Sequence, residues 1–454
     1  MQAQGNVSIL NRVNITKLLT KGGAVYGAVG FSLEDEEAYV IEAKAVLVAT
    51  GGAAGLYKPN NPGFSRHKMW YPPFNTGAGY AMGIQAGAEM TSFEMRFIAL
   101  RCKDTIAPTG TIAQGVGAKQ INAHGEARQV NSRGFVYEDK YGLTTSERVY
   151  GTVKENQQGN GPCYLQTSGI DKEQEENLLK AYLNMAPSQT LKWIETGELP
   201  GEQDVEIEGT EPYIVGGHTA SGYWVDTNRE TTIHGLYAAG DVAGGCPQKY
   251  VTGALAEGEL AAKAIEAQLI GNAKVSDGKA GPFENDLAKK AGSSQEKIKK
   301  YIEAEAGQEI DAYRHILSEH KSSFTAEELE EAMQKVMDEY AGGISTHYQY
   351  NEKQLKLADE KIDQLIALAD QLAAENMHEL LFVYELKERL IVCKSLIAHL
   401  RGRKETRWHS FNENLDYPET DENYFKYVNS RLVDGKLQII LRDIVKEGSY
   451  EHTN

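Results

Sequence analysis

The stretch Val46-Leu-Val-Ala-Thr-Gly-Gly52 decides the fold together with a second one, Thr232-Ile-His-Gly-Leu-Tyr-Ala-Ala-Gly-Asp241. Each runs from an apolar strand directly into a glycine turn, and an unbroken apolar run is typical of a strand buried on both faces. Glycine lets backbone approach a dinucleotide closely, and Asp241 falls at the carboxyl end of its strand, where open α/β sheets bind ligands. Each stretch alone is also compatible with an ordinary strand and turn. Both together, in this order, predict a dinucleotide site.

The residues before the first stretch predict a small hairpin or meander. Alternating apolar residues indicate strands over 7–10, 12–19, 24–31 and 38–42, with a turn at Lys21-Gly22-Gly23. The last of these strands leads into the buried run that ends at the first glycine turn. We therefore expect the meander to adjoin the dinucleotide site.

Three further regions follow. Glycine and alanine dominate 76–93, which predicts a helix packed closely against a sheet or a ligand. Residues 95–210 lose clear periodicity, apart from a helix near 173–184, and this is typical of an inserted domain. From 297 to 401, apolar residues recur at three- and four-residue spacing and predict helices. The aromatic, charged tail contains an expected strand over 436–441.

Composition bears on localisation and partners. The formal net charge of −17 argues against a nucleic-acid partner, because phosphate backbones need clustered lysine and arginine. No run of about 18 apolar residues and no charged-then-apolar leader is present, so we expect no membrane insertion and a cytoplasmic location. The four cysteines lie far apart without a metal-ligand spacing, so we expect no metal held by this chain. They are Cys102, Cys163, Cys246 and Cys393.

The two glycine-turn stretches resemble the ATGG and GLYAAGD elements of the fumarate reductase/succinate dehydrogenase flavoprotein family. The resemblance implies FAD as the cofactor, with ribityl hydroxyls near Asp241. That family also carries an upstream G-x-G-x-x-G, which grips the FAD pyrophosphate at a helix N-terminus. Met1 corresponds to a point already inside the family's FAD domain, so we expect an N-terminally truncated chain without the first βαβ unit.

The expected fold class is α/β, with a partial, Rossmann-like FAD-binding domain, an inserted α+β capping domain and a C-terminal helical domain. The predicted boundaries follow in chain order. They are 1–98 for the partial FAD-binding domain, 99–215 for the capping (substrate) domain, 216–271 for the return segment of the FAD-binding domain, 272–296 for a linker, 297–401 for the helical domain and 402–454 for a C-terminal extension.

Two positions argue against reduction of a dicarboxylate. Fumarate reductases carry an arginine proton donor in a stretch that corresponds to 110–117, and Gln114 falls in its place. Glutamine cannot deliver a proton as a general acid. A second arginine of that family, which follows the flavin-loop Gly-Asp, corresponds to Lys249.

Over nearly its whole length the chain resembles the α subunits of dissimilatory-type adenylylsulfate reductase. Six segments carry the resemblance, and simple fumarate reductases do not share the last two. They are Lys68-Met-Trp-Tyr-Pro-Pro-Phe-Asn-Thr-Gly-Ala-Gly-Tyr-Ala-Met-Gly83, Glu94-Met-Arg-Phe-Ile98, Arg101-Cys-Lys-Asp104, Glu211-Pro-Tyr-Ile-Val-Gly-Gly-His218, Glu385-Leu-Lys-Glu-Arg-Leu390 and Glu405-Thr-Arg-Trp408.

The resemblance implies roles for individual residues. Arg101 and His218 would be catalytic and would hold the sulfate–phosphate end of the nucleotide, since a histidine can bond an oxyanion and change charge near neutral pH. Arg148 would stack on adenine, which suits a planar guanidinium. Trp70 would pack near the isoalloxazine ring. The implied cofactor-binding set is Thr50, Gly51, Gly52, Trp70, Gly240, Asp241, Lys249 and Thr252.

Each of these side chains also has a purely structural alternative. Trp70 could be packing in a proline-rich loop, and His218 could be an ordinary structural histidine. Arg148 could be a solvated helix charge, and Arg101 could belong to a surface ion pair beside Lys103. The sequence alone leaves these alternatives open.

The activity implied is the reduction of adenosine 5′-phosphosulfate to sulfite and AMP, or the reverse, through a sulfite adduct at flavin N5. Electrons would come from a ferredoxin-like iron–sulfur β subunit that carries the clusters. Two alternatives remain. One is a fumarate reductase/succinate dehydrogenase-like flavoprotein acting on another small anionic substrate, and the other is a non-catalytic remnant that only binds a nucleotide or a partner.

Overall fold

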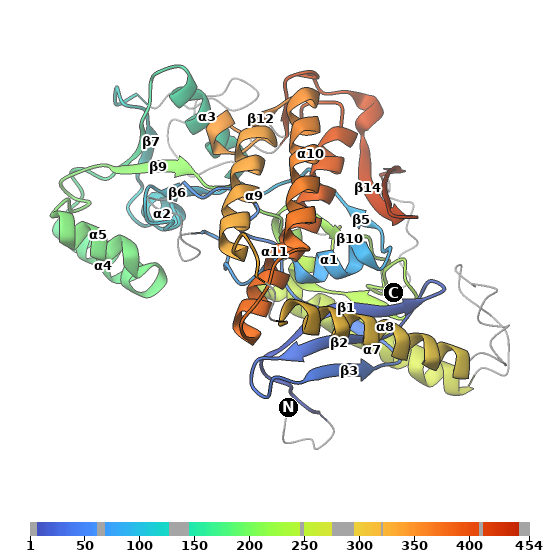
Figure 1. The fold of residues 1–454 in the computed structure, drawn as a ribbon. Helices are drawn as coiled ribbons and strands as arrows, with labels where there is room; N and C mark the ends of the chain where they lie inside the picture. Colours follow the sequence, from blue (N-terminus) through green and yellow to red (C-terminus); the bar gives the residue numbers. More distant parts are fainter. Residues whose placement is uncertain are drawn as a thin grey trace.

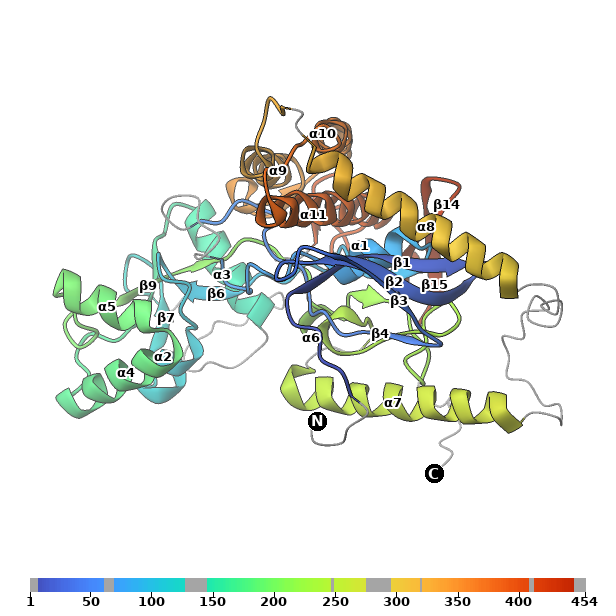
Figure 2. The same cartoon turned by 60° about the horizontal axis from the view of Figure 1, so that its bottom comes forward.

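The computed structural model describes residues 7–60, 69–126, 145–245, 249–274, 295–318, 321–407 and 412–444. Figure 1 shows a central body of sheets and helices with a smaller lobe, made of residues between about 97 and 215, on one side. The view in Figure 2 shows that α7 (Tyr250–Lys274) and α8 (Gln295–Ile316) lie on opposite sides of the sheets in the central body.

The N-terminal meander forms an antiparallel sheet in the order β1 (Val13–Lys21), β2 (Ala24–Ser32), β3 (Ala38–Glu42). These strands confirm three of the four predicted ones. The strand expected over 7–10 is wrong, because these residues are exposed and pair with no strand in the described part of the chain. A lone extended segment leaves its backbone groups without ladder partners. One face of the meander is covered by α8 (Gln295–Ile316).

The two decisive stretches form the parallel pair β4 (Val46–Val48) and β11 (Leu236–Ala238). Leu236 lies opposite Val46, and Ala238 lies opposite Val48. Because parallel strands end at the same edge of a sheet, the glycine turns that follow them meet there. The predicted strands are confirmed, and this pairing positions the site.

The glycine-rich helix α1 (Ala78–Gln85) is shorter than the predicted 76–93. It stops because Gly87 adopts a left-handed φ of 78°, and the chain then forms β5 (Met90–Thr91). The predicted close packing is confirmed: a Cβ at Gly79 would lie 2.1 Å from Thr50 Oγ1. The helix therefore presses directly on the first glycine turn.

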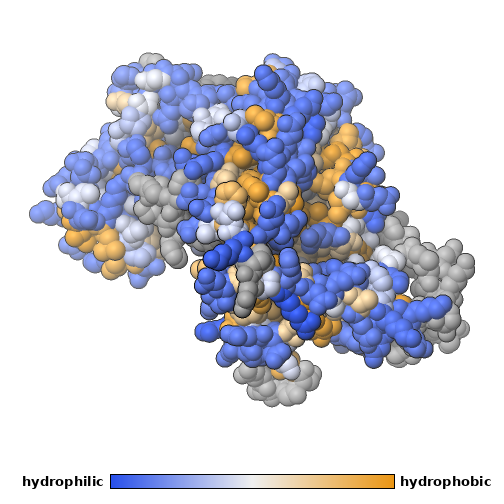
Figure 3. Space-filling model, viewed as in Figure 1, coloured by the Kyte–Doolittle hydropathy of each residue, from blue (hydrophilic) through white to orange (hydrophobic). Residues whose placement is uncertain are grey.

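The side lobe has its own sheet and its own core. Its strands pair antiparallel in the order β6-β9-β8-β7, and its core contains Tyr182 and Trp193. The predicted helix near 173–184 is confirmed as α4. Figure 3 shows a hydrophobic patch on this lobe. Leu191 and Ile194 are among the exposed hydrophobic residues of the lobe. The elements are β6 (Leu100–Cys102), α2 (Gly110–Gly115), β7 (Lys119–Ile121), α3 (Thr145–Gln157), β8 (Cys163–Gln166), α4 (Lys172–Met185), α5 (Pro187–Thr196) and β9 (Val205–Gly209).

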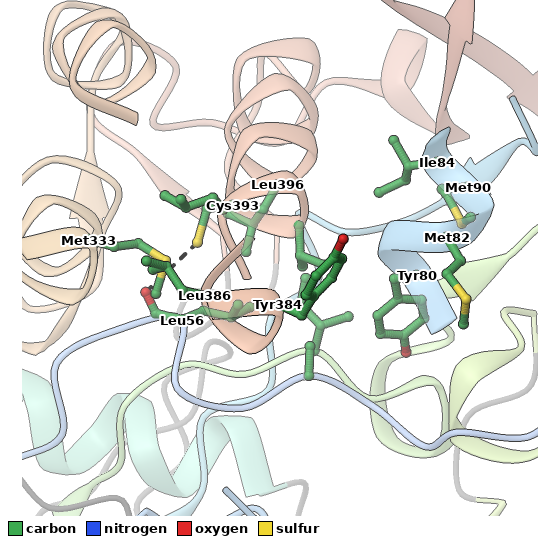
Figure 4. Close-up of a cluster of buried hydrophobic side chains, with 14 of the residues drawn as sticks. Leu56, Tyr80, Met82, Ile84, Met90, Met333, Tyr384, Leu386, Cys393 and Leu396 are labelled. Carbon is green, nitrogen blue, oxygen red and sulfur yellow. Dashed lines mark hydrogen bonds between the residues drawn. The ribbon is translucent and has the colours of Figure 1, made fainter. Parts of the chain in front are cut away.

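The predicted helices of the C-terminal half are confirmed as α8, α9 (Ala326–Tyr340), α10 (Glu352–Ala369) and α11 (Met377–Gly402). They share a hydrophobic core with β4, β11 and α1. Figure 4 shows this core, in which Leu56, Met333 and Leu396 come from three distant segments. Among these helices, α11 packs against α1, and α8 packs against β1 and β2.

The segment after α11 returns to the central body. The predicted strand over 436–441 is confirmed as β15 (Lys436–Asp443), which pairs with β14 (Lys426–Val433) in a four-stranded sheet of order β10-β5-β14-β15. Of the predicted linker 272–296, residues 275–294 lie outside the described residues. The remaining short elements are α6 (Gly216–Thr219), β10 (Gly222–Tyr223), the long α7 (Tyr250–Lys274), β12 (Gln349–Tyr350) and β13 (Glu413–Asn414).

Candidate active site

A tyrosine joins the two glycine turns at the edge of the β4–β11 pair. The hydroxyl of Tyr71 accepts a hydrogen bond from the Gly52 N–H (3.0 Å) and donates one to Asp241 Oδ2 (3.0 Å). Burial and the Asp241 carboxylate raise the pKa of Tyr71, so the phenol keeps the proton that it donates. Tyr71 was not predicted as a site residue from the sequence. The one indication of its role is that it follows Trp70 in the same loop.

The turns border a cavity of about 460 Å³, a size typical of small-molecule sites. Four residues predicted from the sequence line it together: Gly51, His218, Gly240 and Asp241. Gly51 and Gly240 have left-handed φ values of 77° and 75°, which an L side chain adopts only under strain. The other lining residues are Leu47, Ala49, Ala239, Tyr250, Val251, Ala254 and Gly258.

Replacing Gly51 by alanine is expected to weaken FAD binding by roughly tenfold or more. The left-handed backbone becomes strained by about 1 kcal/mol, and the new Cβ would lie 2.4 Å from Asn75 Nδ2, whose hydrogen bond to Thr50 O (2.8 Å) fixes the turn. Quenching of FAD fluorescence on titration measures the affinity.

Gly22→Ala provides the matched control. Gly22 has a similar φ of 60° in the β1–β2 turn, and a Cβ there would meet nothing within 4 Å in the described part of the chain. This variant should lose comparable stability and keep its FAD affinity. Equal FAD affinities for the Gly51→Ala variant and the wild type would show that this turn does not contact the cofactor.

His218 lies in α6 with its ring packed against two aromatic residues. The ring centroids lie 4.4 Å from Phe97 and 5.3 Å from Tyr250. Its Nδ1 is buried without a hydrogen-bond partner among the residues that the structure describes. Burial lowers the pKa of His218 and Arg101 lowers it further, while Asp241 opposes them. The unliganded ring is therefore neutral near pH 7, and it offers a hydrogen bond rather than a fixed charge.

Arg101 provides the positive charge beside the site. Its guanidinium carbon lies 3.4 Å from the Trp70 ring centroid, the flat arrangement of a cation–π contact. Arg101 Nη1 donates to the Leu100 carbonyl at 2.8 Å. The neighbouring Lys103 pairs instead with Glu206. Asp104, the other charged neighbour, pairs with Lys192 at 3.5 Å.

Glu211 lies behind this pair. Its Oε1 accepts a hydrogen bond from the Trp70 N–H at 3.1 Å, and the residue is 2% exposed. Burial raises the pKa of Glu211 to about 7. From the sequence, Glu211 was identified only as part of a motif and no role was predicted for it. Its contact with Trp70 joins two segments that are 141 residues apart and meet only in the folded chain.

The other predicted site residues have different surroundings. Lys249 is buried, and its ammonium donates to the Gly240 carbonyl (2.7 Å) and pairs with Glu257 (3.2 Å), so it holds the second turn in shape. Arg148 on α3 is 6% exposed and is not a solvated helix charge. Neither Arg148 nor the exposed Thr252 is among the described residues that line the cavity. The side chain of Gln114 lies outside the described part.

The arrangement fits a bound dinucleotide. Two glycines with a left-handed backbone line the cavity together with the Asp241 carboxylate and the His218 ring. The buried Nδ1 of His218 has no hydrogen-bond partner among the described side chains. Within the described ranges, no group of three His, Cys, Asp or Glu side chains could hold a metal ion, and no helix is long and apolar enough to cross a membrane. Cys246 lies outside them.

Comparison with known proteins agrees with this geometry. Residues 1–253 match the family described as FAD binding domain. The adenylylsulfate reductase α subunit of Megalodesulfovibrio gigas is 29% identical, over 94% of this chain and 70% of the relative. The solved adenylylsulfate reductase of Archaeoglobus fulgidus is 32% identical with a TM-score of 0.81, and the chain covers 75% of it.

A second solved structure, an adenosine-5-phosphosulfate reductase in complex with sulfite as a covalent adduct, is also 32% identical. It matches with a TM-score of 0.82, over 99% of this chain and 75% of that one. These matches confirm the expected fold class. The chain therefore belongs to the FAD-dependent oxidoreductases of the fumarate reductase and adenylylsulfate reductase family, as a homologue of the adenylylsulfate reductase α subunit.

Proposed function

We propose that this protein reduces adenosine 5′-phosphosulfate to sulfite and AMP, or catalyses the reverse reaction. The observation that carries the proposal is the Arg101 guanidinium stacked on Trp70 at 3.4 Å, close enough to His218 to lower the pKa of that ring. Phe97 contacts both the His218 ring and Tyr213, so the charge and the histidine belong to one cluster.

The cofactor would lie between the two glycine turns. Thr50, Gly51, Gly52 and Gly240 would hold it through their backbone, and the carboxylate of Asp241 would bond its ribityl hydroxyls. Lys249 would contribute by fixing the second turn, and Thr252 would contribute from the first turn of α7. When bound, FAD would supply the two-electron chemistry at the sulfur of the substrate. The solved relative that holds sulfite as a covalent adduct supports this assignment.

The chain's own residues would bind and orient the substrate. Arg101 would neutralise the negative charge that accumulates on the leaving phosphate, and neutral His218 would donate a hydrogen bond to an oxygen of the same group. Trp70 would pack near the isoalloxazine ring and hold Arg101 flat. Arg148, which belongs to the side lobe, would stack on adenine.

We further propose a ferredoxin-like iron–sulfur β subunit as the electron donor and the cytoplasm as the location. The reaction consumes two electrons, and this subunit would deliver them to the flavin. The resemblance of the C-terminal segments, including Glu385-Leu-Lys-Glu-Arg-Leu390, to adenylylsulfate reductase α subunits supports this partner.

Anaerobic reoxidation of the flavin distinguishes the candidate substrates. The protein loaded with FAD is reduced photochemically and mixed with adenosine 5′-phosphosulfate or, separately, with fumarate. The proposal predicts return of the oxidised flavin spectrum with adenosine 5′-phosphosulfate alone. Reoxidation by fumarate alone would favour the fumarate reductase/succinate dehydrogenase-like alternative, and reoxidation by neither would reject both substrates.

A further inference from the structure

We propose that Glu211 is a positioning residue whose protonation is coupled to oxyanion binding: it takes up a proton when a sulfate-like or phosphate-like group binds beside Arg101. In its neutral form Glu211 orients the stacked Trp70 and Arg101 side chains for anion binding. This inference rests on the proposed function in one respect, the assignment of the oxyanion-binding position to Arg101 and His218.

The Glu211 carboxyl group contacts Trp70, which stacks on Arg101 at the proposed oxyanion-binding position. Its Oε1 accepts the Trp70 N–H at 3.1 Å, and Trp70 in turn stacks on Arg101 at 3.4 Å. Its Oε2 is buried and has no hydrogen-bond partner in the described ranges. A buried carboxylate oxygen without a partner is costly when charged, whereas a protonated one can donate to a bound anion.

The charges that face Glu211 come from several elements. Burial raises its pKa to about 7, Arg101 on β6 favours ionisation, and Glu208 on β9 opposes it. Tyr213 and Tyr348 lie within electrostatic range, and burial raises the pKa of both phenols, so they stay neutral. His218 stays uncharged near pH 7 because burial lowers its pKa. Glu211 and Glu208 are therefore the groups of this cluster that titrate near neutral pH.

Linkage fixes the sign of the effect. An anion beside Arg101 brings negative charge close to Glu211 and offsets the attraction of Arg101, and both changes raise the pKa of Glu211 further. Binding must then be accompanied by proton uptake. By the same linkage, affinity for the anion falls as pH rises above the pKa of the unliganded carboxyl, by at most about tenfold per pH unit.

Inorganic sulfate is the probe, because its own charge stays constant near neutral pH. Isothermal calorimetry of the full chain in two buffers with different ionisation heats measures both the affinity and the protons taken up. At a pH near the pKa of Glu211, we expect wild type to take up part of a proton for each sulfate bound. Its affinity for sulfate should fall about three- to tenfold per pH unit between about pH 7 and 9. Glu211→Gln should take up none and show a flat profile.

Glu208→Gln is the matched control. Burial raises the pKa of Glu208 to about 7 as well, and it lies directly opposite Arg101 in the β6–β9 pair. Because Glu208 raises the pKa of Glu211, the control should keep a pH dependence and proton uptake, with the midpoint shifted to lower pH. If Glu211 had a purely structural role, Glu211→Gln would bind sulfate more weakly than wild type at every pH. A flat profile with the affinity preserved would exclude that role.

A pH dependence that survives Glu211→Gln, one that disappears in Glu208→Gln, or no sulfate binding at any pH would each overturn the inference. The proposed function fails separately. Proton-coupled sulfate binding in a protein whose reduced flavin ignores adenosine 5′-phosphosulfate would keep Glu211 in this role and reject the substrate.

Discussion

Replacing Arg101 by alanine is expected to lower kcat/KM for adenosine 5′-phosphosulfate by a factor on the order of 10²–10³. Two losses combine in this variant. The positive charge beside the leaving phosphate disappears, and the Trp70 ring loses the guanidinium that covers it at 3.4 Å. Since neutral His218 cannot replace the missing charge near pH 7, the remaining site binds the charge of the transition state poorly.

Arg101→Lys separates the two contributions. Lysine keeps the charge but cannot lie flat on the indole, so we expect an intermediate loss of roughly tenfold. Arg314→Ala, which removes an exposed arginine on α8, should leave the rate within about twofold of wild type. Steady-state assays of adenosine 5′-phosphosulfate reduction provide the comparison. Equal rates for the Arg101→Ala and Arg314→Ala variants would show that Arg101 does not contribute to the active site.

Replacing Arg403 by methionine is expected to destabilise the fold by about 3–5 kcal/mol. Arg403 Nε donates to Glu94 (2.8 Å) and Nη1 to Glu405 (2.7 Å), and both carboxylates are fully buried. Although burial disfavours ionisation of Glu94, Arg403 and His399 hold its pKa below the usual value. Without the guanidinium, the buried Glu94 loses its arginine partner, whereas Glu405 keeps its pair with Arg407. Urea unfolding followed by circular dichroism measures the loss.

Arg401→Met is the control for this prediction. Arg401 lies two residues earlier and pairs with Glu352 at 2.9 Å, but its side chain is 33% exposed. Solvent screening limits such a pair to about 1 kcal/mol or less. If both variants unfold at the same urea concentration, the buried cluster that fixes the end of α11 does not stabilise the fold more than a surface pair does.

The sequence predicted most of the elements that form the site. The apolar runs before Gly51 and Gly240 could be recognised because a doubly buried strand followed by glycine is a local pattern. The coupling of the two turns could not be recognised, because Tyr71 reaches Asp241 from a loop that is distant in sequence. Only the folded chain brings them together.

Other differences have the same physical origin. The predicted helix over 76–93 was too long because the pattern of small residues continues past Gly87, where the backbone turns left-handed. The packing of the helical region could not be predicted either: Met333 and Leu396 pack with Leu56, which is distant in sequence, in a single core. Helical periodicity shows which face is buried but not which partner covers it. The role of Glu211 could not be predicted from the sequence either, because its partner Trp70 is distant along the chain.

The most direct test of the central claim is the response of the bound flavin to sulfite. The protein loaded with oxidised FAD is titrated with sulfite, then with sulfite and AMP, while the visible absorption band of the flavin is followed, with succinate as the control. Bleaching by sulfite that deepens with AMP, and none with succinate, is the result that we predict. A flavin that is bound but unchanged by sulfite and AMP would contradict the proposed reaction and leave a family member with a different substrate.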